Sequence, residues 1–147
     1  MQGFLSQEDL HDLALWKSER SAGNVRRNDR SFVEKLTRTA LRLADDPELP
    51  ASVPISVLTL LDGVRVPTAS VILTVWHPDR YGIIDRNAWS ALFNRPQVRT
   101  REFEPREYDY YLQILRELAD ITRVTPREVD MALYRWWIEE RERKTAT

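Results

Sequence analysis

Apolar residues recur three and four positions apart along most of this chain, a spacing that places them on one face of a helix. Ala69, Ile72, Leu73 and Trp76 show this spacing clearly. No segment alternates apolar and polar residues for long enough to predict a strand. We therefore expect an all-α fold, one compact domain of about seven helices over residues 1–147.

Local start signals divide this pattern into helices. Ser6 with Asp9, and Thr125 with Glu128, have the spacing of capping boxes. The other expected starts lie near Asn28 or Asp29, Ile55, Pro67, Asp85 and Tyr108. The basic stretch 21–28 and the proline-rich stretch 44–54 are expected to be loops. The buried face of the last helix is expected to contain Val129, Ala132, Leu133 and Trp136.

Composition excludes several classes of site. The chain has no cysteine, which removes disulfides, thiolate zinc sites and iron–sulfur clusters. Only His11 and His77 offer imidazoles, so we expect neither a metal nor another cofactor. No run approaches twenty apolar residues and no signal peptide is recognisable, so a cytoplasmic protein without membrane contact is expected.

The net charge of −1 hides an uneven distribution of charge. Between Lys17 and Arg42 eight basic residues face three acidic ones, whereas acids outnumber arginines between Glu102 and Glu142. One part of the chain is therefore suited to an anion such as the DNA backbone. A solvated basic loop is the alternative for this stretch.

The most informative segment is 60–89, LLDGVRVPTASVILTVWHPDRYGIIDRNAW. It predicts a helix-hairpin-helix over about residues 55–76, with Gly63 in the turn and Pro67 at the start of the second helix. Unpaired N–H groups of such a turn suit a phosphate. A plain glycine turn between two packed helices is the alternative.

This segment resembles the helix-hairpin-helix and aspartate signature of the HhH-GPD superfamily of DNA glycosylases. Leu61, Gly63, Val64 and Ala69 match the hairpin, and the segment Ile83–Ile84–Asp85 matches the second part of the signature. The resemblance implies an all-α fold that grips the DNA backbone and excises a flipped base. It covers about thirty residues strongly and the flanking helices only loosely.

The chain departs from the superfamily pattern in three ways. Arg65 replaces the second hairpin glycine, and Asp62 replaces the usual proline. Pro67 stands where bifunctional members have a nucleophilic lysine, so lyase chemistry from that position is excluded. Any glycosylase activity is therefore expected to be monofunctional.

The resemblance assigns roles to specific residues. Asp85 is the expected catalytic carboxylate, although an ordinary N-cap is an equal alternative. DNA contacts are expected from Gly63, Val64, Arg65, Val66 and Thr68 of the hairpin, and from Lys17, Arg20, Arg26 and Arg27. Candidate walls of a base pocket are Trp16, Trp76, Tyr81 and Trp89. A catalytic Lys17 amine would require a lowered pKa.

Two functional hypotheses follow. The first is a DNA-binding protein, with DNA as its partner, that hydrolyses the N-glycosidic bond of a flipped base. The second is a helix-hairpin-helix module that binds DNA or a protein and has no catalysis.

Overall fold

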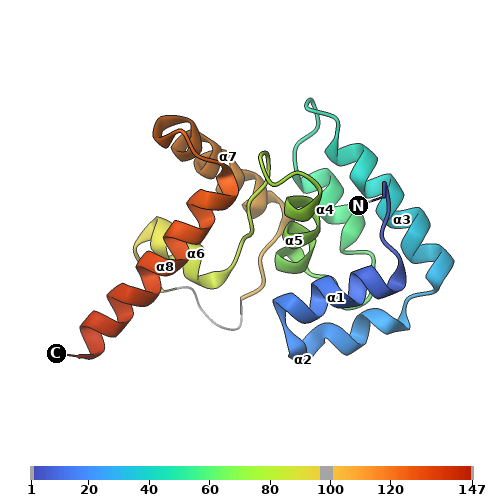
Figure 1. Ribbon diagram of the computed structural model, residues 1–147, viewed down its shortest axis with the longest axis horizontal. Coiled ribbons are helices and arrows are strands. Elements are labelled where there is room, and N and C mark those ends of the chain that lie inside the picture. Colours follow the sequence, from blue (N-terminus) through green and yellow to red (C-terminus); the bar gives the residue numbers. More distant parts are fainter. Residues whose placement is uncertain (1, 97–100, 147) are drawn as a thin grey trace.

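The described residues form eight α-helices and one 3₁₀ helix, whose arrangement is shown in Figure 1. The computed structural model describes residues 2–96 and 101–146, and these ranges contain no strand. The expected all-α class is therefore confirmed. The elements are α1 (Gln7–Lys17), α2 (Glu19–Ala22), η1 (Gly23–Arg27), α3 (Arg30–Ala44), α4 (Ser52–Leu58), α5 (Val66–Trp76), α6 (Arg86–Phe93), α7 (Pro105–Thr122) and α8 (Pro126–Thr145).

The expected helix starts are largely confirmed. Both capping boxes form, at Ser6 with Asp9 before α1 and at Thr125 with Glu128 before α8. The Asp29 side chain accepts from the Phe32 N–H and caps α3. These caps satisfy backbone N–H groups that the first turn of a helix leaves unpaired. No described helix combines the length and apolarity needed to cross a bilayer.

Two expected loops are wrong. Stretch 21–28 is mostly helical, because Ala22 and Val25 bury their side chains and make α2 and η1 pack beside α1. Stretch 44–54 is shorter than expected, since α4 already begins at Ser52. Pro54 is tolerated there because it lies in the first turn, where its missing N–H would have no helical partner.

The expected buried face of α8 is also partly wrong. Ala132 is exposed and Trp136 is 45% exposed, whereas Val129, Asp130 and Trp137 are buried. The helix packs on α6 and α7 through a face turned by about one residue from the expected one. The spacing of apolar residues did not predict this face, because Asp130 is one of its buried residues.

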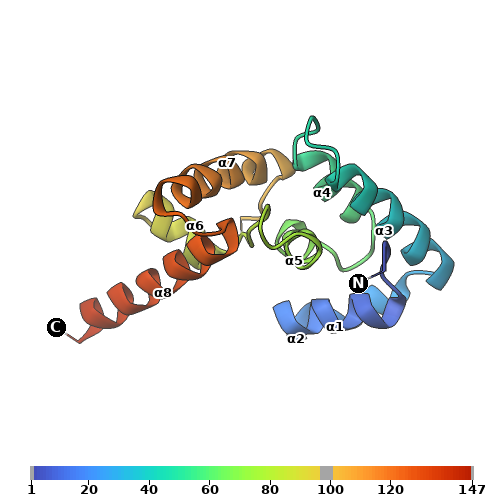
Figure 2. The ribbon, with the colours of Figure 1, turned by 45° about the horizontal axis from the view of Figure 1, so that its top comes forward.

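The helices form two groups around α5. Helices α1, α3 and α4 lie on one side of α5, and α6, α7 and α8 lie on the other (Figures 1 and 2). Contacts between α4 and α7 join the groups at one end. In Figure 2 the chain forms an arch, with α1 and α2 at one foot and α8 at the other.

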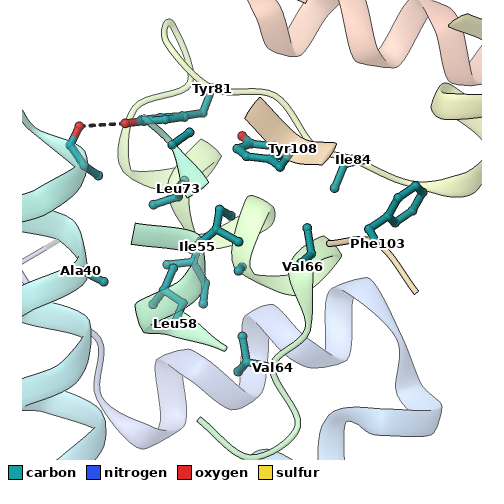
Figure 3. Close-up of a cluster of buried hydrophobic side chains, with 14 of the residues drawn as sticks. Ala40, Ile55, Leu58, Val64, Val66, Leu73, Tyr81, Ile84, Phe103 and Tyr108 are labelled. Atoms are coloured by element: carbon teal, nitrogen blue, oxygen red, sulfur yellow. Dashed lines mark hydrogen bonds between the residues drawn. The ribbon is translucent and has the colours of Figure 1, made fainter. Parts of the chain in front are cut away.

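The core lies where α3, α4 and α5 meet the loop that follows α5 (Figure 3). Ile55, Leu58 and Leu73 are fully buried there. The Tyr81 ring is also buried, and its hydroxyl donates to the Ala44 carbonyl at 2.7 Å. Burying apolar side chains such as these supplies most of the driving force for folding.

Residues 59–65, here called the hairpin, form the turn that joins α4 to α5. Asn28 is buried and fixes the hairpin, because its side chain donates to the Val25 and Asp62 carbonyls and accepts from the Asp62 N–H. Gly63 has φ +78°, and a Cβ there would lie 2.9 Å from both Asn24 Cβ and Val25 N. The turn therefore packs directly on η1.

We expect Gly63→Ala to lower the free energy of unfolding by about 2–4 kcal/mol, because alanine resists positive φ and its Cβ meets the backbone of η1. Urea unfolding followed by circular dichroism measures this loss. Gly23→Ala is the matched control, since a Cβ at Gly23 meets nothing within 4 Å. Equal stability of the two variants would show that the turn does not need glycine.

Candidate functional site

Two hollows meet at Lys17 and Asp85. The first, here called the hairpin groove, has a volume of about 910 Å³ and runs between α1, α2, the hairpin and residues 101–103. The second, the α8 cleft, has a volume of about 700 Å³ and runs between the end of α1 and α8. Lys17 and Asp85 line both, so they mark the junction of the hollows.

The segment 82–84, just before Asp85, is extended and buried, and side chains from three helices hold its backbone. Tyr108 and Tyr111 of α7 donate to the Gly82 and Ile83 carbonyls at 2.8 and 2.9 Å. The Ile83 N–H donates to the Asp130 carboxylate of α8 at 2.7 Å, and the Ile84 N–H donates to Ser70 Oγ of α5 at 3.1 Å.

These four bonds replace the sheet ladder that an extended segment normally has. The close packing of α7 and α8 against this segment also favours glycine at position 82. A Cβ on Gly82 would lie 2.6 Å from Leu115 Cδ1, 3.1 Å from Asp130 Oδ2 and 3.2 Å from the Pro126 carbonyl oxygen. The position of Asp85 is therefore fixed by α5, α7 and α8 together.

Asp85 is the N-cap of α6. Its Oδ1 accepts from the Asn87 and Ala88 N–H groups at 2.8 and 2.9 Å. Its Oδ2 accepts no hydrogen bond from any residue that the structure describes. The side chain is only partly buried, so this carboxylate is both a cap and a wall of the two hollows.

The hairpin has backbone donors that no described residue uses. Gly63 and Arg65 line the groove, and their N–H groups have no hydrogen-bond acceptor among the described residues. Thr68 of the first turn of α5 lines it as well. Val64 also lines it, but its N–H donates to the Leu61 carbonyl at 3.2 Å. Free N–H groups near a helix N-terminus favour an anion.

Basic side chains outnumber acidic ones along the hairpin groove. Its basic residues are Lys17, Arg20, Arg27, Arg65, Arg86 and Arg101, and its acids are Asp62, Asp85 and Glu102. Arg65 pairs with Glu102 at 2.5 Å, and Arg101 pairs with Glu107 outside the groove. Both arginine side chains are largely exposed, so these ion pairs are weak. An anionic ligand can therefore take the place of the glutamate in each pair.

The α8 cleft has a charged floor and partly apolar walls. Asp130 is 1% exposed and forms an ion pair with Arg127. Burial raises the pKa of Asp130 to about 6, although the Ile83 N–H and Arg127 oppose the shift. Trp16 and Tyr134 line the same cleft, and the Arg127 guanidinium lies 6.0 Å from the centre of the Trp16 ring.

Lys17 lies in an unusual setting for a lysine. Its ammonium forms no ion pair with a described residue, although Asp85 and Asp130 are near enough to stabilise its charge. Burial dominates and lowers the pKa of the Lys17 amine, with a smaller contribution from the Arg127 cation. A catalytic Lys17 amine requires a lowered pKa, and the pKa is shifted in that direction.

The structure brings together only some of the residues expected at the site. The hairpin groove contains Lys17, Arg20, Arg27, Gly63, Val64, Arg65, Thr68 and Asp85. Arg26 is exposed outside both hollows, and Val66 is buried in the core.

Of the four expected base-pocket aromatics, Trp16 alone lines a hollow. Trp76 donates to Asp45, which also contacts His77 at 2.6 Å, on a surface outside both hollows. Tyr81 belongs to the core, and Trp89 is buried against Phe93 and Phe103. These three side chains line neither hollow, so the structure does not place them in a base pocket.

Sequence reasoning missed the contribution of α8. Arg127, Asp130 and Tyr134 line the α8 cleft and were not among the expected site residues. A signal was present, because Asp130 is a charged residue on the same helix face as Val129 and Leu133. A charge on an apolar face is costly unless it is paired, so it indicates a special role.

Comparison with known proteins returned nothing: no family model, no curated protein and no solved structure matches the chain. The described residues also contain no cluster of three or more side chains suited to a metal ion.

The pKa of Asp130 predicts a specific pH dependence. Because the carboxyl titrates near 6 in the folded protein and near 3.8 in the unfolded chain, it stabilises the fold fully below pH 3.8 and loses this contribution as the pH rises through 6. Asp130→Asn cannot titrate. Between pH 7 and pH 4 the wild type should gain about 2 kcal/mol of unfolding free energy relative to Asp130→Asn.

Urea unfolding of both proteins at several pH values measures that difference. The exposed Asp120→Asn on α7 is the matched control. A wild-type advantage that stays constant between pH 4 and pH 7 would contradict the pKa assigned to Asp130.

Proposed function

We propose that this protein binds DNA along the hairpin groove and hydrolyses the N-glycosidic bond of a flipped nucleotide with Asp85. The observation that carries the proposal is the meeting of three features at one place. A carboxylate, a turn with free backbone donors and a set of unpaired cations all line the same groove.

The binding part rests on charge and geometry. Arg20 and Arg27 line the groove together with the hairpin and form no ion pairs among the described residues. Backbone donors and arginines contact phosphates without reading sequence. Such a groove therefore suits the DNA backbone rather than a particular base.

The catalytic part rests on the Asp85 carboxylate. Loss of a base leaves positive, oxocarbenium-like charge on the sugar, and a nearby carboxylate stabilises that charge or activates the attacking water. One oxygen of Asp85 is used in capping α6, while Oδ2 has no partner in the described part of the chain. Capping and catalysis are thus compatible in one side chain.

The α8 cleft is the proposed place for the extruded base. Its volume of about 700 Å³ lies in the usual range for a small-molecule site. Trp16 and Tyr134 offer rings for stacking, and Met131 adds an apolar surface. Its position next to Asp85 is suited to a nucleotide whose sugar lies at the junction and whose base lies beyond it.

A second candidate function is DNA binding without catalysis. The observation that favours it is the ordinary N-cap geometry of Asp85, which accounts for this residue on structural grounds alone. Pro67 at the place of the superfamily's nucleophilic lysine is consistent with it.

A base-release assay with Asp85→Asn separates the two candidates. Asparagine caps a helix as well as aspartate does, so the variant should keep the stability of α6 while losing the negative charge. Oligonucleotides containing uracil, hypoxanthine, oxidised guanine, adenine opposite oxidised guanine or alkylated purines are incubated with protein and then cleaved with alkali. The wild type should release at least one base, and Asp85→Asn should lose at least about 100-fold in rate.

Asp29→Asn is the matched control, because Asp29 caps α3 in the same way but lies outside both hollows. This control should keep the wild-type rate. DNA binding without base release by the wild type would favour the non-catalytic module. Absence of both binding and release would refute the proposal as a whole.

A further inference from the structure

Lys17 is the one amine at the junction of the two hollows. It is the last residue of α1, and with Asp85 it lines both the hairpin groove and the α8 cleft. The chain has three lysines, and the other two, Lys35 and Lys144, line neither hollow. An amine at this place is therefore a distinct feature of the site rather than part of a general lysine-rich surface.

The surroundings of Lys17 favour a reactive amine over a structural ion pair. A structural lysine of this burial would normally contact a carboxylate directly, yet Lys17 has no ion pair in the described part of the chain. Asp85 and Asp130 are both near enough to act on its charge, and Arg127 opposes them. Burial lowers the pKa of the amine, which increases the fraction of the neutral, nucleophilic form.

A simple phosphate contact explains this arrangement less well. Such a side chain is usually exposed, as those of Arg20 and Arg27 are along the same groove. Lys17 is instead partly buried next to the carboxylate proposed to act on the sugar. The proposed function places the sugar of an extruded nucleotide at this junction, so the Lys17 amine would lie beside the sugar rather than beside a backbone phosphate.

We propose that the Lys17 amine attacks C1′ of an abasic deoxyribose as a nucleophile and forms a covalent imine with it. This inference rests on the proposed function, because it takes the junction as the place of the nucleotide's sugar. It adds a strand-cleaving step that does not use the hairpin position occupied by Pro67.

The step balances without a further reactant. The amine adds to the C1′ aldehyde of the ring-opened sugar and loses water, which forms a C=N bond. A carboxylate at the junction, Asp85, takes a proton from C2′, and the C3′–O bond breaks with release of the 5′-phosphorylated downstream strand. Water then hydrolyses the imine, which frees the unsaturated aldehyde and regenerates the amine.

Borohydride trapping on a preformed abasic site tests this inference independently of base excision. The duplex contains one abasic site, produced beforehand from uracil, and sodium borohydride reduces any imine to a stable protein–DNA adduct. We expect an adduct with the wild type and none above background with Lys17→Arg, which keeps the positive charge but not the nucleophile. Lys35→Arg is the matched control, since Lys35 is exposed on α3, and it should give the wild-type yield.

Two further measurements keep the outcome unambiguous. Circular dichroism verifies that Lys17→Arg is folded, and peptide mapping of the wild-type adduct should locate the modification on Lys17. An adduct that persists in Lys17→Arg, that maps to another amine, or that fails to form with the wild type overturns the inference. Base release that depends on Asp85 but gives no adduct would leave the proposed function standing and refute this step alone.

Discussion

The site depends on the need to satisfy the backbone of one buried, extended segment. Residues 82–84 run between helices without a neighbouring strand, so side chains must supply their hydrogen-bond partners. Ser70, Tyr108, Tyr111 and Asp130 do so from three helices. An unpaired buried peptide group costs on the order of 1–3 kcal/mol, so these contacts select one arrangement of α5, α7 and α8. Asp85 is the next residue in the chain, so the same contacts fix its position.

The same constraint joins the two halves of the molecule. Helix α5 contributes the hairpin donors at its start and the Ser70 hydroxyl in its middle. A single helix therefore fixes the distance between the hairpin turn and Asp85. The cost of burying Asp130 is offset partly by Arg127, which in turn forms the floor of the α8 cleft. The residues that hold the helices together thus also line the candidate site.

Much of the fold was predictable because it depends on local signals. Capping signals and apolar spacing correctly indicated where α1, α3, α5 and α8 begin, although the predicted buried face of α8 was partly wrong. Stretch 21–28 was misread as a loop because α2 and η1 are short and bury only Ala22 and Val25. Such elements form through tertiary contacts that no local pattern encodes.

The candidate site was predictable only in part. Gly63 and Asp85 could be identified from the chain because a turn glycine and a cap each have a local signature. The proximity of Lys17 to Asp85 could not be predicted, since these residues are far apart in sequence and meet only through packing of the helices. The same holds for α8, whose Asp130 and Tyr134 reach the site because the helix packs on α6 and α7.

The measurement that tests the central claim most directly is a nuclear magnetic resonance titration of the labelled protein with duplex DNA. The duplex carries a stable analogue of an abasic nucleotide, which cannot react. The account predicts shifts of the Gly63, Arg65 and Lys17 amides and little change at the exposed Arg38 and Arg42 of α3. Binding that shifts the α3 resonances and leaves the hairpin and the junction unchanged, or no binding, would contradict it.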